Sequence, residues 1–102
     1  MENFYIYIIY SERSDRYYVG YSSNIEARIE RHNNPKFSSY TSRHIPWILM
    51  ASIMVGNDRG KAIVIEKYIK KQKSRKFIEQ IIENKENSEF IDKLVRVPLE
   101  RD

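Results

Sequence analysis

Two short segments rich in tyrosine and β-branched residues stand near the start of the chain, separated by six polar residues. The first runs from Phe4 to Tyr10 and the second from Tyr17 to Tyr21. Segments of this length and composition are typical of β-strands, and the polar connection lets them pair as an antiparallel hairpin. Gly20 lies inside the second segment, which indicates a bulge or a close approach to the backbone.

The residues that follow predict a helix, a third strand and more helices. Ile25 and Ile29 are four residues apart and predict a helix over about 24–32, capped by Ser23. The apolar run from Trp47 to Val55 has the length of a buried strand. Further helices are expected at about 60–73, 75–84 and 88–95, before Pro98 ends regular structure. This element order, in 102 residues, predicts a single domain.

Composition excludes several classes of protein. The chain has no cysteine, which rules out disulfides, thiolate catalysis and iron–sulfur clusters and fits a cytoplasmic location. Its apolar N-terminal run has seven residues and follows Glu2, so we expect neither a membrane span nor a signal peptide. With three glycines and no phosphate-cradling loop, the sequence argues against a nucleotide-dependent enzyme.

Basic residues gather in one segment of this chain, whose net charge is +4. From Lys61 to Lys76 there are seven basic residues and one acid. A solvated helix face and a footprint for phosphates explain this density about equally well. The candidates for phosphate contacts are Lys67, Lys70, Lys71, Lys73, Arg75 and Lys76.

Glu66 lies on the apolar stripe of the second predicted helix, where an isolated charge is costly. A salt bridge to a neighbouring basic residue is the simpler explanation. A metal site is the alternative, because Mg²⁺ is often held by one carboxylate together with waters and substrate phosphate oxygens.

Arg28 and His32 continue the apolar stripe of the first helix, and Tyr7 and Tyr18 lie on the two hairpin strands. Arg28 could extend along the core edge or hold a phosphate. His32 could cap its helix or transfer protons. A tyrosine can act as a general base when neighbouring cations lower its pKa, although a structural role is the default for each of these residues alone.

A series of short elements over about residues 4–82 resembles the GIY-YIG nuclease family. The elements are Tyr5-Ile6-Tyr7, Tyr18-Val19-Gly20, Arg28 followed by His32-Asn33, Tyr40-Thr41, Ile45-Pro46-Trp47, and Ala62 followed by Glu66-Lys67-Tyr68-Ile69-Lys70. Each is weakly specific alone, whereas their order and spacing are jointly specific. The sequence departs from the family pattern at Tyr5, Asn34-Pro35 and Ile65.

The resemblance implies an α+β fold, in which helices flank a three-stranded antiparallel sheet in the order β-β-α-β-α-α. It implies a nuclease domain over residues 1–84, with 85–102 as an extension that could hold a short helix. It further implies a metal-dependent endonuclease acting on DNA, with RNA not excluded. The implied catalytic residues are Tyr7, Tyr18, Arg28, His32 and Glu66, with Glu66 holding Mg²⁺ or Mn²⁺. The implied nucleic-acid contacts add Tyr40 and Arg43 to the basic segment.

Two other functions stay open. A domain of this fold could bind nucleic acid without cutting it, or the basic helix could meet an acidic protein partner. The first predicts salt-sensitive binding with no metal-dependent product. The second predicts no preference for nucleic acid over other polyanions.

Overall fold

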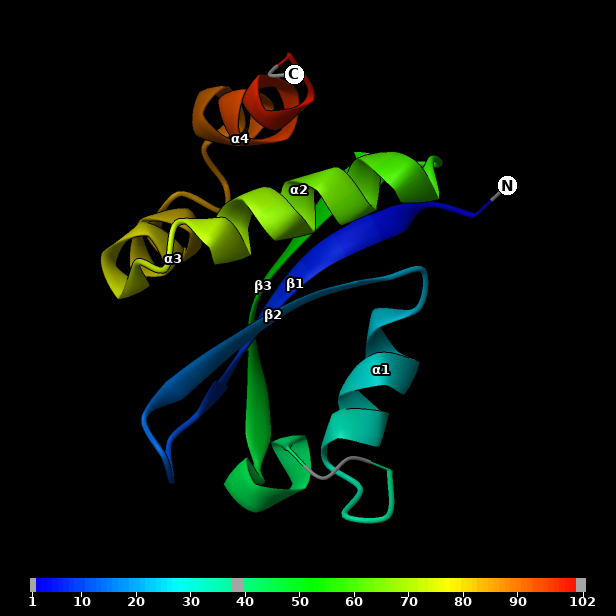
Figure 1. The fold of residues 1–102 in the computed structure, drawn as a ribbon, viewed down its shortest axis with the longest axis vertical. Coiled ribbons are helices and arrows are strands. Elements are labelled where there is room, and N and C mark those ends of the chain that lie inside the picture. Colours follow the sequence, from blue (N-terminus) through cyan, green and yellow to red (C-terminus); the bar gives the residue numbers. More distant parts are fainter. Residues whose placement is uncertain (1, 38–39, 101–102) are drawn as a thin grey trace.

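The structure, a computed structural model, describes residues 2–37 and 40–100. Its elements in chain order are β1 (Phe4–Ser11), β2 (Arg16–Ser22), α1 (Ile25–His32), a 3₁₀ turn η1 (Thr41–His44), β3 (Trp47–Gly56), α2 (Arg59–Lys71), α3 (Arg75–Glu83) and α4 (Ser88–Glu100). Figure 1 shows them as one sheet with helices on both sides. The last two residues of the expected extension, 101 and 102, lie outside the described residues.

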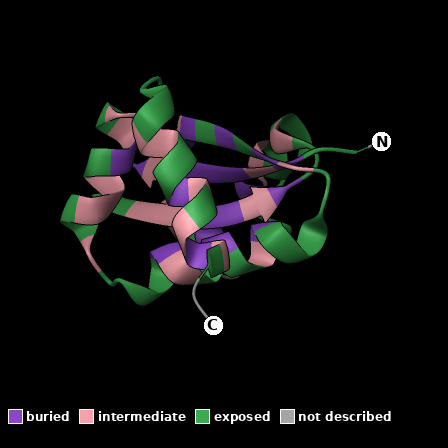
Figure 2. Ribbon diagram, turned by 90° about the horizontal axis from the view of Figure 1, so that it is seen from above, coloured by how far each residue is buried: buried purple, intermediate pink, exposed green. Residues whose placement is uncertain are grey.

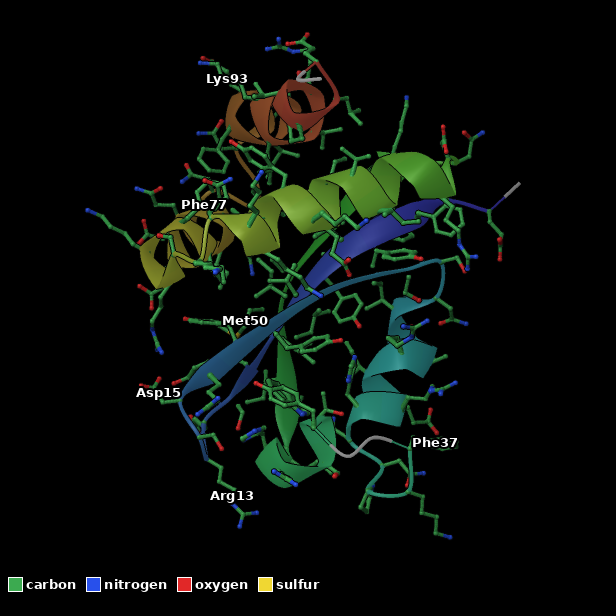
Figure 3. All side chains as sticks on the ribbon, in the orientation of Figure 1. Arg13, Asp15, Phe37, Met50, Phe77 and Lys93 are labelled. Carbon is green, nitrogen blue, oxygen red and sulfur yellow. The ribbon has the colours of Figure 1, made fainter. Side chains whose placement is uncertain are left out.

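The strands form one antiparallel sheet in the order β2-β1-β3, which confirms the fold class expected from the sequence. β1 and β2 form the predicted hairpin, whose tip carries Arg13 and Asp15 (Figure 3). Their register sets Tyr7 opposite Gly20 and Ile9 opposite Tyr18. β1 is therefore the central strand, and its side chains alternate between the two faces of the sheet.

The larger core covers the face of the sheet that carries Ile6 and Ile8. Both side chains are fully buried, and α2 covers them with Ala62, Ile65 and Ile69. α3 and α4 complete this layer through Ile81 and Leu94. Figure 2 shows buried positions along the strands and on the inward sides of the helices.

The opposite face holds a smaller core of Tyr7, Ile9 and Trp47, covered by α1. Trp47 reaches it because the register of β3 on β1 shifts near Met50. Ile9 pairs with Leu49 and Ile8 with Ala51, so one residue is passed over. An extra residue of this kind reverses the facing of the strand beyond it, which puts Trp47 on the α1 side.

Three local expectations were wrong. Asn24, not Ser23, caps α1, because its side-chain oxygen accepts from the Ala27 N–H at 3.1 Å. β3 is an edge strand, with exposed apolar side chains at Ile48, Leu49 and Met54.

The third correction concerns Pro98, which does not end regular structure but lies inside α4. Pro98 and Leu94 are buried one turn apart, so α4 continues to Glu100 with both on its packed side. In the described part of the chain, no helix combines the length and apolar character that a membrane crossing needs.

Candidate active site

The candidate site lies at the outer edge of β2, where the two faces of the sheet meet. Tyr7 comes from the central strand and extends over Gly20, its partner on β2. A Cβ at Gly20 would lie 2.5 Å from the Tyr7 hydroxyl oxygen, so this position has room only for hydrogen. The close approach expected at Gly20 is confirmed, and it brings the phenol to the sheet edge.

Tyr7 and His32 form the buried centre of the site. The Tyr7 hydroxyl is 2.7 Å from His32 Nε2, and the exposed fractions of the two residues are 1% and 8%. Burial raises the pKa of Tyr7 well above its ordinary value, while the Arg28 guanidinium acts in the opposite direction. The phenol is therefore protonated at neutral pH and can donate to the imidazole.

His32 is neutral at physiological pH. Burial lowers its pKa to about 4, and the charges of Arg28 and Arg31 act in the same direction. A neutral imidazole offers one bare nitrogen as an acceptor. The pairing thus makes His32 Nε2 the acceptor and the Tyr7 O–H the donor.

Glu66 comes from α2 and faces α1 across a cavity of about 130 Å³. Gly20, Ser22, Arg28 and Arg59 are also among its lining residues, so the carboxylate shares this space with two guanidinium groups. Arg28 is an exposed residue, although it lies on the same helix as the buried His32. Two arginines beside one carboxylate can receive an anionic group such as a phosphate.

Both sequence-based explanations of Glu66 retain support. Its side chain is 17% exposed, and the Lys70 ammonium lies 3.6 Å from Glu66 Oε2, which is the salt bridge of the simpler explanation. No group of three or more acidic, histidine or cysteine side chains among the described residues could form a complete metal cage. One accessible carboxylate beside an open cavity nevertheless fits a largely hydrated Mg²⁺ or Mn²⁺, which needs few protein ligands.

Tyr18 lines the same region from β2. Its ring centroid lies 4.9 Å from that of His32 and 6.5 Å from that of Tyr7. Lys70 Nζ lies over the Tyr18 ring, 5.3 Å from the centroid. The five residues expected to be catalytic therefore lie around one edge of the sheet, with Lys70 joining Glu66 to Tyr18.

The expected nucleic-acid contacts separate into two groups. Tyr18 shares a second cavity, of about 380 Å³, with Tyr40, Lys70, Lys73 and Arg75. The other expected contacts are exposed but do not line it: Arg43, Lys67, Lys71 and Lys76.

Arg59 is a site residue that the sequence reading missed. Its guanidinium lies 5.9 Å from the Phe4 ring and 6.0 Å from the Tyr21 ring, next to Glu66. The spacing of seven residues to Glu66 puts both on one face of a helix. This spacing could be seen in the sequence, but the expected helix began one residue too late to include Arg59.

Comparison with known proteins settles the family. The family described as the GIY-YIG catalytic domain matches residues 3–80. The chain belongs to the GIY-YIG family. A GIY-YIG domain indicates a nuclease-type function on nucleic acid, generally with a divalent metal, and the matched range contains all five residues around the β2 edge.

The individual proteins to which this chain is similar carry names that state no activity. A "UPF0213 protein" of Bacillus licheniformis is 38% identical over 81 residues, covering 79% of this chain and 80% of the relative. One from Staphylococcus haemolyticus is 34% identical over 83 residues, covering 78% of this chain and 99% of the relative. No solved structure matches this GIY-YIG chain.

Proposed function

We propose that this GIY-YIG domain is a metal-dependent endonuclease that hydrolyses phosphodiester bonds in DNA. One observation carries the proposal: the Glu66 carboxylate and the Arg28 guanidinium line one cavity at the β2 edge, beside the buried Tyr7–His32 pair. An anionic diester entering this cavity meets cations from α1 and α2 together. A solvated helix face would not need a buried phenol and a neutral imidazole beside it.

Each residue has a role that its surroundings support. Arg28 and Arg59 bind the phosphate, and Arg28 offsets the charge that builds on its oxygens during the reaction. Glu66 holds Mg²⁺ or Mn²⁺, which when bound supplies polarisation of the scissile phosphate.

Tyr7 and His32 position the attacking water in this proposal. The Tyr7 hydroxyl accepts a hydrogen bond from the water and donates its own to His32 Nε2, its partner at 2.7 Å, which fixes the orientation of the phenol. Tyr18 closes the site on the β2 side. The basic residues of α2 follow the strand backbone without reading its sequence.

The remaining parts of the proposal concern context. Residues 1–84 form the nuclease domain, and 85–102 form an extension that contributes α4 to its core. We expect the enzyme to select DNA by its structure, in repair, recombination or processing, because this domain offers few residues that could read bases. The absence of cysteine in the sequence favours the cytoplasm.

The decisive experiment compares wild type with Glu66→Gln on plasmid, branched and single-stranded substrates, in Mg²⁺, in Mn²⁺ and in chelator. The variant keeps the shape of the side chain and removes its charge, so cleavage should fall by at least about 1,000-fold while binding persists. Glu89→Gln on the exposed side of α4 is the matched control.

Three results would overturn the assignment. Normal cutting by Glu66→Gln would make Glu66 structural. Unfolding of the variant, seen by circular dichroism, would support the simple salt bridge with Lys70. Binding of wild type to DNA with no product in either metal would favour the non-cleaving module.

A further inference from the structure

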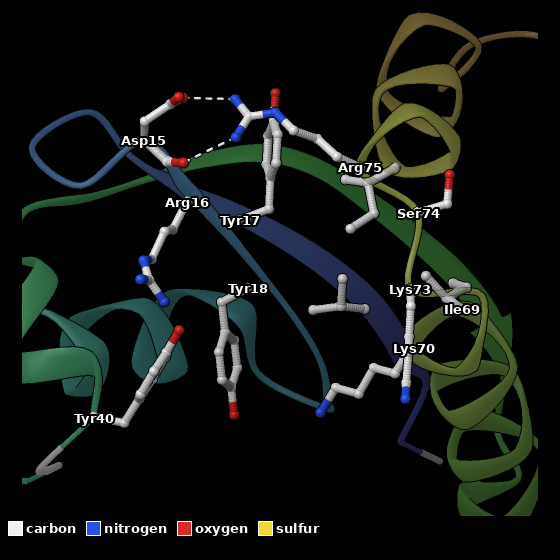
Figure 4. Close-up of a pocket in the computed structure, with 12 residues that line it drawn as sticks. Asp15, Arg16, Tyr17, Tyr18, Tyr40, Ile69, Lys70, Lys73, Ser74 and Arg75 are labelled. Atoms are coloured by element: carbon white, nitrogen blue, oxygen red, sulfur yellow. Dashed lines mark hydrogen bonds and ion pairs between the residues drawn. The ribbon is translucent and has the colours of Figure 1, made fainter.

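The larger cavity, of about 380 Å³, has a lining that combines aromatic, cationic and apolar groups (Figure 4). Val19, Ile69 and Ile78 supply its apolar part. Figure 4 shows Tyr18 and Tyr40 on one side of the space and Lys70 on the other. Its volume falls in the range of small-ligand sites, roughly 300–1,000 Å³.

Tyr40 gives the cavity an accessible aromatic surface. The residue is 45% exposed, and its ring centroid lies 6.3 Å from that of Tyr18, with 36° between the planes. The two rings are therefore too far apart and too tilted to cover each other fully. An accessible ring beside a second tyrosine suits a flat, partly apolar ligand, and bases stack on such surfaces whatever their identity.

The cationic side depends on Lys70 and Lys73. Arg75 also lines the cavity, but its guanidinium is engaged by Asp15 and by Glu79 at 2.5 and 3.3 Å. Lys73 forms no ion pair with any residue that the structure describes, and it is exposed. Its positive charge is thus available to an anionic ligand.

The backbone at Lys73 gives independent support for a role of its side chain. Lys73 follows the end of α2 with φ = 49°, in the left-handed region, and its N–H donates to the Lys70 carbonyl at 3.1 Å. Glycine or asparagine is usual at this position after a helix, because a Cβ is strained there. A lysine here keeps a conformational cost that a glycine would remove, which is typical of functional positions.

The cavity adjoins the candidate active site through shared residues. Lys70 Nζ lies 3.6 Å from Glu66 Oε2 and over the ring of Tyr18, which lines the larger cavity. A ligand held there would lie next to a phosphodiester placed at Glu66. The two spaces therefore suit consecutive parts of one strand.

We propose that this cavity binds one unpaired nucleotide of a nucleic-acid strand, adjacent to the phosphodiester that is cut. The base stacks on Tyr40 and Tyr18, and its phosphate binds Lys70 and Lys73. In a duplex the faces of a base are covered by its neighbours, so only an unpaired base can stack in this way. The preferred substrate is consequently single-stranded or locally unpaired. Only the position of the cut rests on the proposed nuclease function.

Binding is measured by fluorescence anisotropy in the Glu66→Gln background, with chelator present so that no strand is cut. One short labelled oligonucleotide is offered single-stranded and as a full duplex, and a free nucleoside monophosphate is the competitor. We expect tighter binding of the single strand, by about 10-fold. Tyr40→Ala should remove this preference and leave duplex affinity within about twofold, since duplex binding needs no stacking.

Lys73→Gly separates ligand binding from a structural role. Removing the Cβ relieves the left-handed strain, so the melting temperature should rise while single-strand affinity falls. Lys93→Gln on the outer side of α4 (Figure 3) is the matched loss of one charge and should change neither quantity. A higher melting temperature with unchanged affinity would show that Lys73 contacts no nucleotide.

The remaining outcomes distinguish this inference from the proposed function. Equal affinity for single strand and duplex, insensitive to Tyr40→Ala, would overturn the nucleotide subsite and leave cleavage untouched. Tight binding of the free nucleoside monophosphate that does not displace the oligonucleotide would also overturn the nucleotide subsite. The expected binding preference in a protein that cuts nothing would support the subsite and overturn the nuclease.

Discussion

The two faces of the sheet differ in what their cores are made of. On the face under α2, α3 and α4, twelve residues are buried, and all of them except Phe4 are aliphatic. The face under α1 has three buried members, Tyr7, Ile9 and Trp47, of which two are aromatic and carry polar atoms. The larger core therefore supplies most of the buried aliphatic side chains of the fold. The smaller core includes a phenol instead, and the imidazole of His32 is buried beside it.

In the proposed function, the buried aliphatic side chains supply stability and the polar groups at the β2 edge supply the chemistry. Substitutions of buried aliphatic side chains should change the free energy of unfolding and leave turnover per folded molecule alone. Substitution of the exposed Arg28 should do the reverse, whereas a change at the buried contact of Gly20 with Tyr7 should affect both quantities. Four experiments can break or sharpen this contrast.

Arg28→Lys should have the largest effect. An ammonium cannot hold two phosphate oxygens as the guanidinium does, so single-turnover cleavage should fall by about 100- to 1,000-fold with little loss of affinity. Arg28→Ala should be only slightly worse, and both should melt like wild type. Arg96→Lys, on the exposed side of α4, is the control. Near-normal cleavage by the Lys variant would refute the phosphate-clamp role.

Ile81→Ala tests the aliphatic face. Ile81 is fully buried on α3, and truncating it should lower the free energy of unfolding by about 3 kcal/mol through lost contacts and a cavity. Chemical denaturation measures this loss. Val64→Ala, at a residue 42% exposed on α2, should change little. A fall in cleavage rate per folded Ile81→Ala molecule would contradict the division of roles.

Gly20→Ala tests the contact on which the site depends. The added Cβ would lie 2.5 Å from the Tyr7 hydroxyl oxygen, and the buried ring has little room to move. We expect a loss of about 2–3 kcal/mol together with a displaced Tyr7–His32 pair. Thermal unfolding and the NMR signals of the His32 ring report the two effects. An unchanged melting temperature would show that β2 shifts to accommodate the added methyl group at little cost.

The pH dependence of stability should show the smallest effect. The pKa of His32 is about 4 in the folded protein against an ordinary 6.5, mainly because of burial and then Arg28 and Arg31. The unfolded chain therefore binds this proton first, and stability falls gradually as pH drops from 6.5 to 4. His32→Gln should flatten the curve of melting temperature against pH over that window. Parallel curves for wild type and variant would show that a group other than His32 causes the pH dependence.

Local patterns predicted the parts of the fold that depend on neighbouring residues. The hairpin, the helix after Ser74 and the close approach at Gly20 all follow from residue types within a few positions of each other. The apolar run from Trp47 looked buried because sequence alone does not say how many partners a strand has. Its register shift near Met50 is set by packing on both faces, which no single segment encodes.

The site could be predicted as a set of residues but not as an arrangement. Helical spacing identified Glu66 and His32, since each lies on an otherwise apolar stripe. The contact of Glu66 with Lys70 lies within α2, four residues apart, and is the salt bridge that the sequence suggested. The contact of His32 with Tyr7 depends instead on how α1 packs against the sheet. The cavity at Tyr40 joins residues from far apart in the chain, so spacing gave no signal for it.

The open edge of the sheet has a practical consequence for handling the protein. Exposed backbone on an edge strand invites pairing with another molecule, and β3 adds apolar side chains at Ile48 and Met54. Side chains cover part of its backbone. The Asn33 amide pairs with both the N–H and the carbonyl of Trp47, and Lys85 donates to the Met50 carbonyl. We expect the loss of these contacts to expose the β3 backbone to pairing with a second molecule, so purification yield and shelf life should depend on Asn33 and Lys85.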